Sequence, residues 1–291
     1  MILQASELFD EAGVIVSTCA RWLSGYQRVK APLSGLKLIQ QTLQISQPVT
    51  IQEHISAGVY FTFNTAHSEH HTDEVTAIQV QPVFQDSVVD WEVAQPKNFA
   101  WIQLFISWEQ LATVTGEPVA QAQSFFARHV GQETGASLAL PQTQALSKDL
   151  HHLLAQEGKQ LALIGKLYSV IFQFIEHIQI RSHLAKCEGC QKKLFNSQNL
   201  LESDTKYSAQ QLAKEVGLTL TALELGFPII ANMTVPEYQI EVAIRKALSQ
   251  QGSGVSLAKR INADTGLAKQ DIEKACLKRF GVLSHQLGSM Q

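Results

Sequence analysis

The sequence predicts an α+β protein, in which a β-rich N-terminal half precedes an all-α C-terminal half. Apolar and polar side chains alternate in several segments between residues 49 and 108, and such alternation of aromatic and β-branched residues predicts strands. Beyond residue 108 the apolar residues recur every three or four positions, which predicts helices. Strands joined by polar turns suggest an antiparallel β-barrel or sandwich, and the helical half contains two helix–glycine–helix units.

Composition excludes several classes of protein. The chain has 291 residues, enough for two domains, and its four cysteines are too few for a disulfide scaffold. No uninterrupted apolar run reaches the ~18–20 residues of a membrane helix, and the acidic N-terminus does not resemble a signal peptide. We therefore expect a cytoplasmic protein without membrane contact.

The two halves of the chain differ in charge. Residues 183–291 hold 13 Lys and Arg against 10 Asp and Glu, whereas residues 1–182 hold 10 against 16. This asymmetry has the sign expected of a C-terminal half that binds nucleic acid.

The elements follow in order along the N-terminal half. A short helical pattern occupies residues 2–16, and residues 36–45 read as a helix or a strand. Strands are expected within 54–64, 78–81 and 101–106, and helices at 109–113 and 119–129. A long helical pattern, 144–183, is expected to break at Gly158 or Gly165, and its apolar stripes either form a subunit interface or pack on the strand domain.

A helix-turn-helix pattern lies at residues 207–227. Ser208 can cap the first helix and Gln211 can complete a capping box, while Gly217 suits the left-handed conformation that ends a helix. Thr219 can cap the second helix. A helix before this unit is expected to begin at Gln191.

A longer helix, Val235–Ser249, follows with Pro236 in its first turn. The second helix–glycine–helix unit comprises 255–263, Gly266 and 269–280, and Gly281 ends it. Two such units joined by one long helix form a repeat.

The C-terminal ~100 residues, the size of one domain, resemble the DNA-binding domain of AraC/XylS-type transcription regulators. The first unit carries the resemblance through LAKEVGLT at 212–219, Leu223, Phe227 and TVPEY at 234–238. The long helix and second unit add Arg245, Ala247, Leu248, Ile261, Asn262, Gly266, Leu267 and KRFG at 278–281.

The upstream half resembles the branch of this family that senses ferric siderophores, the pyochelin-regulator type. The matching stretches are SAGVYFTF at 56–63, IQLFISWEQL at 102–111 and GKLY at 165–168. The resemblance implies a cupin-like domain for a small-molecule effector, a homodimer, and control of iron-uptake genes. It suggests a sensor domain at 1–142, a dimerisation segment and linker at 143–185, and a DNA-binding domain at 186–291.

The first helix-turn-helix departs from the family pattern. Its outward positions are Leu220, Thr221, Glu224 and Leu225, and Pro228 is expected to cut the helix short. No Lys or Arg lies between Glu215 and Arg245, Asn232 replaces a glycine, and Ser284 replaces a proline. We therefore expect the second unit to provide more of the affinity for DNA.

The residues expected to bind DNA are Lys269, Gln270, Lys274, Lys278, Arg279, Thr219, Thr221 and Arg245. The alternative is a degenerate AraC-like protein that acts through contacts with another protein.

Cys187 and Cys190 form a CxxC pair preceded by His183, which is a metal-ligand and redox spacing. A metal or an iron–sulfur cluster would need further ligands, from Cys19, Cys276 or a second subunit. A reversible disulfide and two ordinary reduced cysteines are the other interpretations.

Aromatic residues of the strand region either fill the core or line an effector cavity. The expected effector-binding residues are Tyr60, Phe63, Trp91 and Trp101. His67, His70 and His71 either bind a metal or belong to a solvated loop. Nucleophile–base pairs, phosphate-binding loops and HExxH are not found, so no enzymatic activity is expected.

Overall fold

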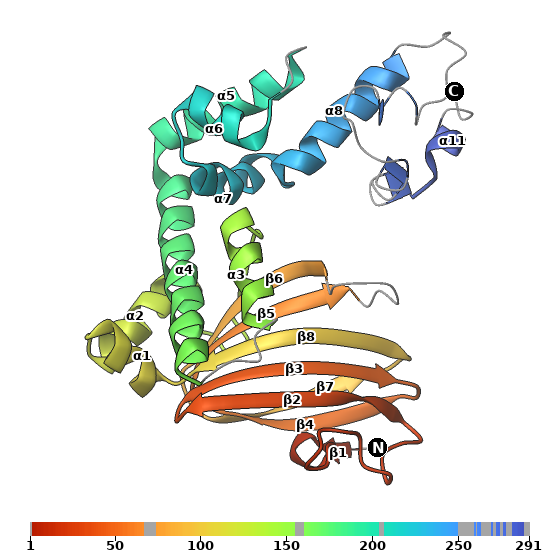
Figure 1. The fold of residues 1–291 in the computed structure, drawn as a ribbon, viewed down its shortest axis with the longest axis vertical. Coiled ribbons are helices and arrows are strands. Elements are labelled where there is room, and N and C mark those ends of the chain that lie inside the picture. The colour runs from red at the N-terminus through yellow and green to blue at the C-terminus, as the bar shows by residue number, and fades with distance from the viewer. Residues whose placement is uncertain are drawn as a thin grey trace. The chain divides into compact units, whose positions relative to one another are not determined.

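The computed structural model describes residues 2–66, 74–154, 160–203, 207–249, 259, 261–262, 269, 272–273, 276–277 and 281–287. The chain divides into two compact units, Met1–Gln179 and Ile180–Gln291, which are described separately (Figure 1). The first contains the strands, and the second is helical where it is described, so the predicted α+β class is confirmed.

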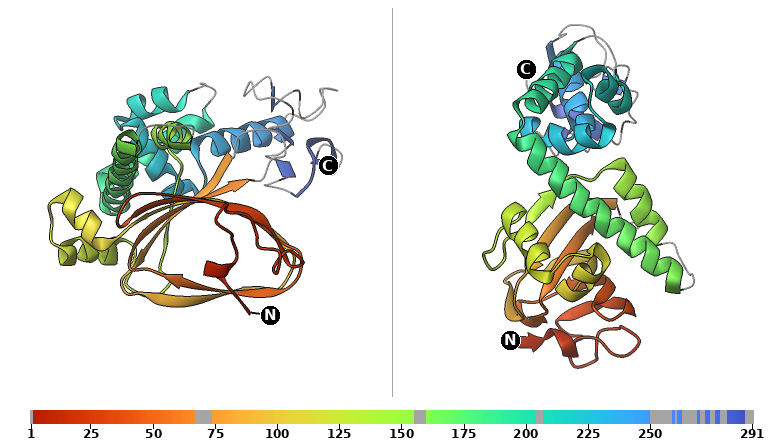
Figure 2. Two further views of the ribbon diagram at one scale, coloured as in Figure 1. Left: turned by 60° about the horizontal axis from the view of Figure 1, so that its bottom comes forward. Right: turned by 90° about the vertical axis from the view of Figure 1, so that its left-hand side faces the viewer.

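The strands of the first unit form two sheets rather than one closed barrel. A six-stranded antiparallel sheet has the order β2-β3-β8-β5-β6-β9, and a three-stranded sheet has the order β1-β4-β7. The left view of Figure 2 shows the two sheets facing each other. The strands are β1 Ile2–Gln4, β2 Leu23–Leu33, β3 Leu36–Ile45, β4 Val49–Ile55, β5 Gly58–Ala66, β6 Glu74–Val83, β7 Ser87–Val93, β8 Lys97–Ile106 and β9 Leu138–Leu140.

The helical pattern expected at residues 2–16 is wrong. This segment contains β1, which pairs in parallel with β4, and a single 3-10 turn at Ala5–Glu7. The pairing partner is almost fifty residues away, so local periodicity could not reveal it. The segment at β3, left open as helix or strand, is a strand paired with both β2 and β8.

Four helices are described between residues 108 and 186, and β9 lies between the second and the third. They are α1 Trp108–Thr115, α2 Val119–His129, α3 Gln144–Leu154 and α4 Gln160–Lys186. Gly165 does not break the long pattern but lies within α4, on an exposed face where a β-carbon would meet no atom within 4 Å. Gly158 lies outside the described residues.

One face of the six-stranded sheet is buried by these helices. The side chains of Val59, Phe61 and Phe63 on β5 are inaccessible to solvent, as is Phe174 of α4. The Phe174 ring stacks on Phe61 at a centroid distance of 4.6 Å and contacts Phe63 at 5.5 Å. Leu167, Val170, Ile171 and Ile178 of α4 join the same core. The apolar stripe of α4 therefore packs on the strand domain.

Helix α4 is also long and apolar enough to cross a membrane, judged by length and composition alone. The sequence analysis, which required an uninterrupted apolar run, did not identify it. One third of its most apolar window is buried inside the protein, where the stripe meets the sheet, and Leu161 at its start is 79% exposed.

The second unit contains α5 Glu188–Glu202, α6 Ala209–Val216, α7 Leu220–Ala231, α8 Val235–Ser249 and α11 Ser284–Leu287. Helix α5 begins three residues before the expected start, because Cys187 caps it through its sulfur. Helix α7 continues past Pro228 and ends where Asn232 adopts the left-handed conformation (φ 54°), so the predicted early termination is wrong. Most of the second helix–glycine–helix unit lies outside the described residues; Gly281, at φ 71°, bonds back to Leu277 as a helix end should.

The helices of the second unit approach each other closely at Gly226 of α7. A β-carbon there would lie 2.9 Å from a methyl carbon of Leu194 on α5 and 3.0 Å from one of Leu184 at the end of α4. Leu194 is fully buried in the core that also contains Leu212 of α6. A residue without a side chain at this point lets α7 approach α5 closely.

We predict that Gly226→Ala lowers the free energy of unfolding of this unit by about 1–2 kcal/mol, because the added methyl group overpacks the contact with two leucines. Gly189→Ala on α5 is the matched control, since its methyl group would meet nothing within 4 Å. Urea unfolding of the two variants measures the difference. Equal stability of both would show that the close approach of α7 is not required.

Candidate functional site

The helices α6 and α7 form a compact helix-turn-helix unit, with residues 217–219 as the turn. Ser208 Oγ accepts the Gln211 N–H at 3.2 Å, and Gln211 Oε1 accepts the Ser208 N–H at 2.9 Å, so the capping box is complete. Gly217 has φ 69°, and the Leu218 N–H bonds to the Ala213 carbonyl at 2.9 Å. Thr219 Oγ1 accepts the Ala222 N–H at 3.1 Å and starts α7. Local capping therefore fixes the angle between the two helices at the turn.

The residues expected to bind DNA lie in three places. Thr219 is the N-cap of α7, and the half-buried Thr221 lies in its first turn. Arg245 lies on α8, where its guanidinium forms an ion pair with Glu202 at 3.3 Å and lies 5.8 Å from the centre of the Tyr238 ring. Lys269 is helical and its side chain is exposed, whereas Gln270, Lys274, Lys278 and Arg279 lie outside the described residues.

The outward surface of α7 is smaller than expected. Leu225, expected to point outward, is completely buried, because α7 has apolar residues on all sides and packs with most of its circumference. Leu220 and Glu224 remain half-exposed. One cation does reach this region: Lys193 of α5 donates to the Gly217 carbonyl at 2.9 Å. Sequence reasoning missed Lys193 because it lies 24 residues from the turn that it contacts.

His183, Cys187 and Cys190 come together where α4 ends and α5 begins. Their ligand atoms lie within 4.8 Å of one another, and Cys190 Sγ lies 3.7 Å from His183 Nε2. The hydrogen bond from the Cys190 thiol lowers the pKa of Cys187 and raises the pKa of Cys190. Cys19 and Cys276 are buried in two other clusters, so they do not join this group. The histidines at 67, 70 and 71 lie outside the described residues.

Three of the four expected effector residues lie on the six-stranded sheet and divide between its two faces, whereas Trp91 lies on β7 of the three-stranded sheet. Phe63 belongs to the helix-side core and is fully buried. Tyr60 lies on the opposite face, the inner face, which turns toward the three-stranded sheet. Trp101 of β8 shares that face, because it pairs with Asn64, and Asn64 lies on the same side of β5 as Tyr60. On the inner face Gln103 donates to Thr62 at 3.1 Å and Gln27 donates to Gln41 at 2.9 Å. The inner face is thus aromatic and polar, unlike the helix side.

A titratable pair spans the space between the sheets. Burial raises the pKa of Glu53 on β4, and a hydrogen bond from the Trp91 indole partly offsets this. Burial likewise raises the pKa of Tyr60 to about 12, and the negative charge of Glu53 contributes to the increase. The Tyr60 hydroxyl donates a hydrogen bond to the Ser56 carbonyl at 3.0 Å.

A pocket of about 520 Å³ opens beside this pair. Trp91, Val89 and Ile55 line it from β7 and β4, and Gln81, the partner of Tyr60 across β5 and β6, lines it from the six-stranded sheet. The Trp91 side chain is 51% exposed. The lining of the pocket includes the acidic residues Asp86, Asp90 and Glu133. A pocket of this volume fits a small organic ligand, and its charge favours a neutral or cationic one.

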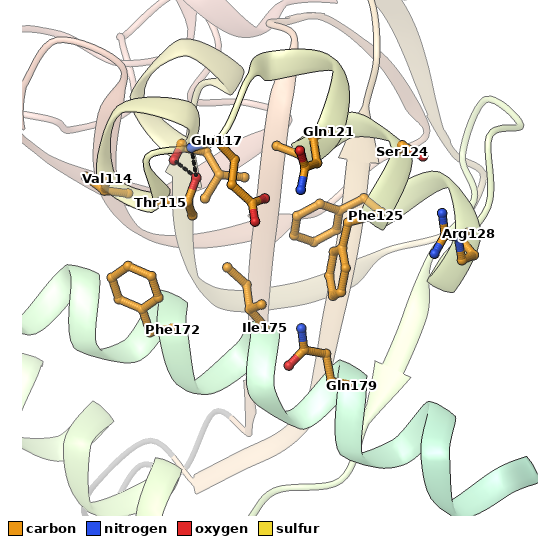
Figure 3. Close-up of a pocket in the computed structure, with 13 residues that line it drawn as sticks. Val114, Thr115, Glu117, Gln121, Ser124, Phe125, Arg128, Phe172, Ile175 and Gln179 are labelled. Atoms are coloured by element: carbon orange, nitrogen blue, oxygen red, sulfur yellow. Dashed lines mark hydrogen bonds between the residues drawn. The ribbon is translucent and has the colours of Figure 1, made fainter.

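A second pocket, of about 460 Å³, lies between α4 and the α1–α2 pair (Figure 3). Ile175 and Gln179 of α4 lie opposite Phe125 of α2, and Phe172 faces Val114 and Thr115 of α1. Arg128 lies at one end of the pocket. The sequence analysis assigned these residues no role.

No family model matches the chain, and no curated protein matches it. Among solved structures it is similar to ToxT from Vibrio cholerae, with 10% sequence identity, a TM-score of 0.27, and coverage of 87% of this chain and 98% of that one. ToxT with a bound unsaturated fatty acid has 12% sequence identity and a TM-score of 0.27, with coverage of 92% of this chain and 94% of that one. ToxT bound to (E)-4-(8-methylnaphthalen-1-yl)but-3-enoic acid has 11% identity and a TM-score of 0.26, with coverage of 84% of this chain and 99% of that one. TM-scores this low do not relate the function of this chain to that of ToxT.

We predict that Glu53→Gln raises the stability of the protein at neutral pH. Because the folded-state pKa of Glu53 is raised, its contribution to stability is present below the ordinary value of 4.5 and is lost as the pH rises through the folded-state value. The amide of the variant stays neutral, so the variant keeps the stability that the wild-type protein loses when Glu53 ionises. The difference in stability should disappear at about pH 4, where the carboxyl of the wild-type protein is also neutral.

Chemical unfolding at both pH values measures this effect, with the exposed Glu92→Gln on β7 as the control. A gain that is independent of pH would contradict the assigned burial of Glu53.

Proposed function

We propose that the protein is a DNA-binding transcription regulator of the AraC type, whose N-terminal unit binds a small effector. The capped helix-turn-helix of α6 and α7 carries the proposal, together with the resemblance of residues 212–281 to that family. A capped α7 presents the positive end of its dipole and its free N–H groups, which suits contact with a phosphate. Lys193 places a cation at the same turn.

The two helix–glycine–helix motifs of the repeat are proposed to share DNA binding unequally. Helix α7 has no Lys or Arg, and Arg245 is already paired with Glu202, so the first motif neutralises few phosphates. The second motif, residues 255–280, contributes Lys269, Lys274 and Lys278. Because affinity for DNA rests largely on such cations, we assign most of it to the second motif. A homodimer would double the number of these contacts.

The effector is proposed to bind at the pocket beside Trp91. Its aromatic, hydrogen-bonding and acidic lining residues suit a neutral or cationic ligand with aromatic rings. The resemblance to the siderophore-sensing branch suggests a ferric siderophore. Tyr60 and Trp101 complete the same inner face, whereas Phe63 belongs to the helix-side core and is left out of this proposal.

A second candidate function is a binding protein that acts through another protein rather than through DNA. The absence of cations from α7, with Glu224 and Leu220 half-exposed, favours it. The buried Leu225 weakens it, because the apolar surface offered to a partner is smaller by one large side chain.

We predict that the double variant Lys274→Ala, Lys278→Ala binds DNA at least about tenfold more weakly, because it loses two phosphate contacts. The slope of log affinity against log salt should fall by about two, one for each lysine. Gel-shift titrations over a salt series measure both quantities, using fragments selected from a genomic library by the wild-type protein.

Lys148→Ala is the matched control, since it removes an exposed lysine of α3 in the other unit. It should leave affinity and slope unchanged. If the wild-type protein retains no fragment at low salt, the DNA-binding function fails and the protein-partner function remains.

We predict that a ferric siderophore quenches tryptophan fluorescence and that Trp91→Phe removes most of this quenching. Trp91 is the indole that lines the pocket, so an iron chelate bound there quenches it first. Trp22→Phe, which changes a buried indole of another cluster, is the control. Equal quenching by the iron-free siderophore would rule out iron as the recognised feature.

A further inference from the structure

We propose that His183, Cys187 and Cys190 form a site for one transition-metal cation of the zinc class, with one coordination position left open. The three side chains come from consecutive elements, the last turn of α4, the cap of α5 and the first turn of α5. The site does not depend on the proposed regulatory function.

The geometry is close to that of a metal-bound cluster. A tetrahedral zinc with Zn–S near 2.3 Å and Zn–N near 2.0 Å separates its ligand atoms by about 3.5–3.8 Å. Cys190 Sγ and His183 Nε2 are 3.7 Å apart, and no pair among the three ligand atoms exceeds 4.8 Å. The longest separation therefore has to shorten by only about 1 Å to match a tetrahedral site.

The backbone around the cluster is already ordered. The Cys187 N–H bonds to the His183 carbonyl at 2.9 Å, and the Gln191 N–H bonds to the Cys187 carbonyl at 2.9 Å, so hydrogen bonds continue across the junction of the two helices. The Cys187 sulfur accepts the Cys190 N–H at 3.4 Å and caps α5. Ligands held on helix ends lose little conformational entropy when a cation binds.

The donor set indicates the class of cation. Two thiolates and one imidazole suit borderline and soft cations, and they exclude magnesium and calcium, which take oxygen ligands. Two thiolate charges neutralise a divalent cation. Three protein ligands with a solvent-exposed His183 leave the fourth position to water, which is the arrangement of an exchangeable site rather than a closed structural one.

A disulfide between Cys187 and Cys190 is the competing use of the same thiols. It would leave His183 without a role, whereas the imidazole lies within a metal-ligand separation of Cys190. The position of His183 beside Cys190 therefore favours the metal.

A cation at this site would fix the corner between α4 and α5. Leu184 and Leu194 lie on the two sides of that corner, and both contact the position of Gly226 on α7. Metal binding is thus expected to stiffen the packing behind the helix-turn-helix. An effect on DNA binding would follow only if the proposed function holds.

The test uses the full chain, purified under reducing, anaerobic conditions and freed of metal by a chelator. We expect it to bind one equivalent of Zn²⁺ or Co²⁺ per chain, with thiolate-to-cobalt absorption for the latter. His183→Ala and Cys190→Ser should each weaken zinc binding at least about tenfold. His183→Cys should restore it, because a thiolate replaces the imidazole.

Cys276→Ala and His54→Ala remove the same kinds of group elsewhere, and both should leave the stoichiometry and the spectrum unchanged. Far-ultraviolet circular dichroism confirms that each variant is folded. Failure of the wild-type chain to bind either metal overturns the proposal, as does binding that survives Cys190→Ser. If peroxide instead links Cys187 to Cys190 in a chain that binds no metal, the pair is a redox pair. None of these outcomes depends on DNA, so the regulatory proposal is tested separately.

Discussion

The packing of α4 on the six-stranded sheet is the interaction on which the first unit depends. Phe174 lies against Phe61 and Phe63, and these three rings are inaccessible to solvent. Large-to-small changes at such positions cost roughly 3–5 kcal/mol, a large part of the stability of a domain. Because the apolar stripe of α4 is occupied in this way, a homodimer would have to use other residues. The same packing leaves the opposite face of the sheet available for a ligand.

In the second unit, close packing and capping together fix the position of α7. Gly226 allows α7 to approach α5, and the turn at Gly217 sets the direction in which α7 leaves α6. The metal-ligand cluster lies at the start of α5, next to the residues that hold α7 in place. If an exchangeable cation binds where α4 meets α5, the rigidity of this unit would depend on the concentration of that cation.

Local signals identified most of the helices and several strands, but they did not reveal how the strands pair. The sequence analysis identified the capping box at Ser208, the left-handed Gly217 and both ends of α8, because each depends on residues that are neighbours in the chain. It missed β1, whose partner is distant, and it assigned Leu225 to the surface, since the near-uniform apolarity of α7 hides which side is buried. The cluster at His183 was predicted from spacing alone. The pocket beside Trp91 brings together separate strands and a distant loop, and spacing does not reveal such a convergence.

The alternation of side chains along β8 also bears on how proteins of this fold can diverge. Ile102 contributes to the helix-side core, while its neighbours Trp101 and Gln103 lie on the inner face. The sheet separates the two surfaces, so substitutions on one face should change stability independently of substitutions on the other. Residues of the inner face can then be replaced without repacking the core that holds the fold together. Ligand preference is therefore free to change faster than architecture, and relatives with the same two sheets are expected to recognise chemically different molecules.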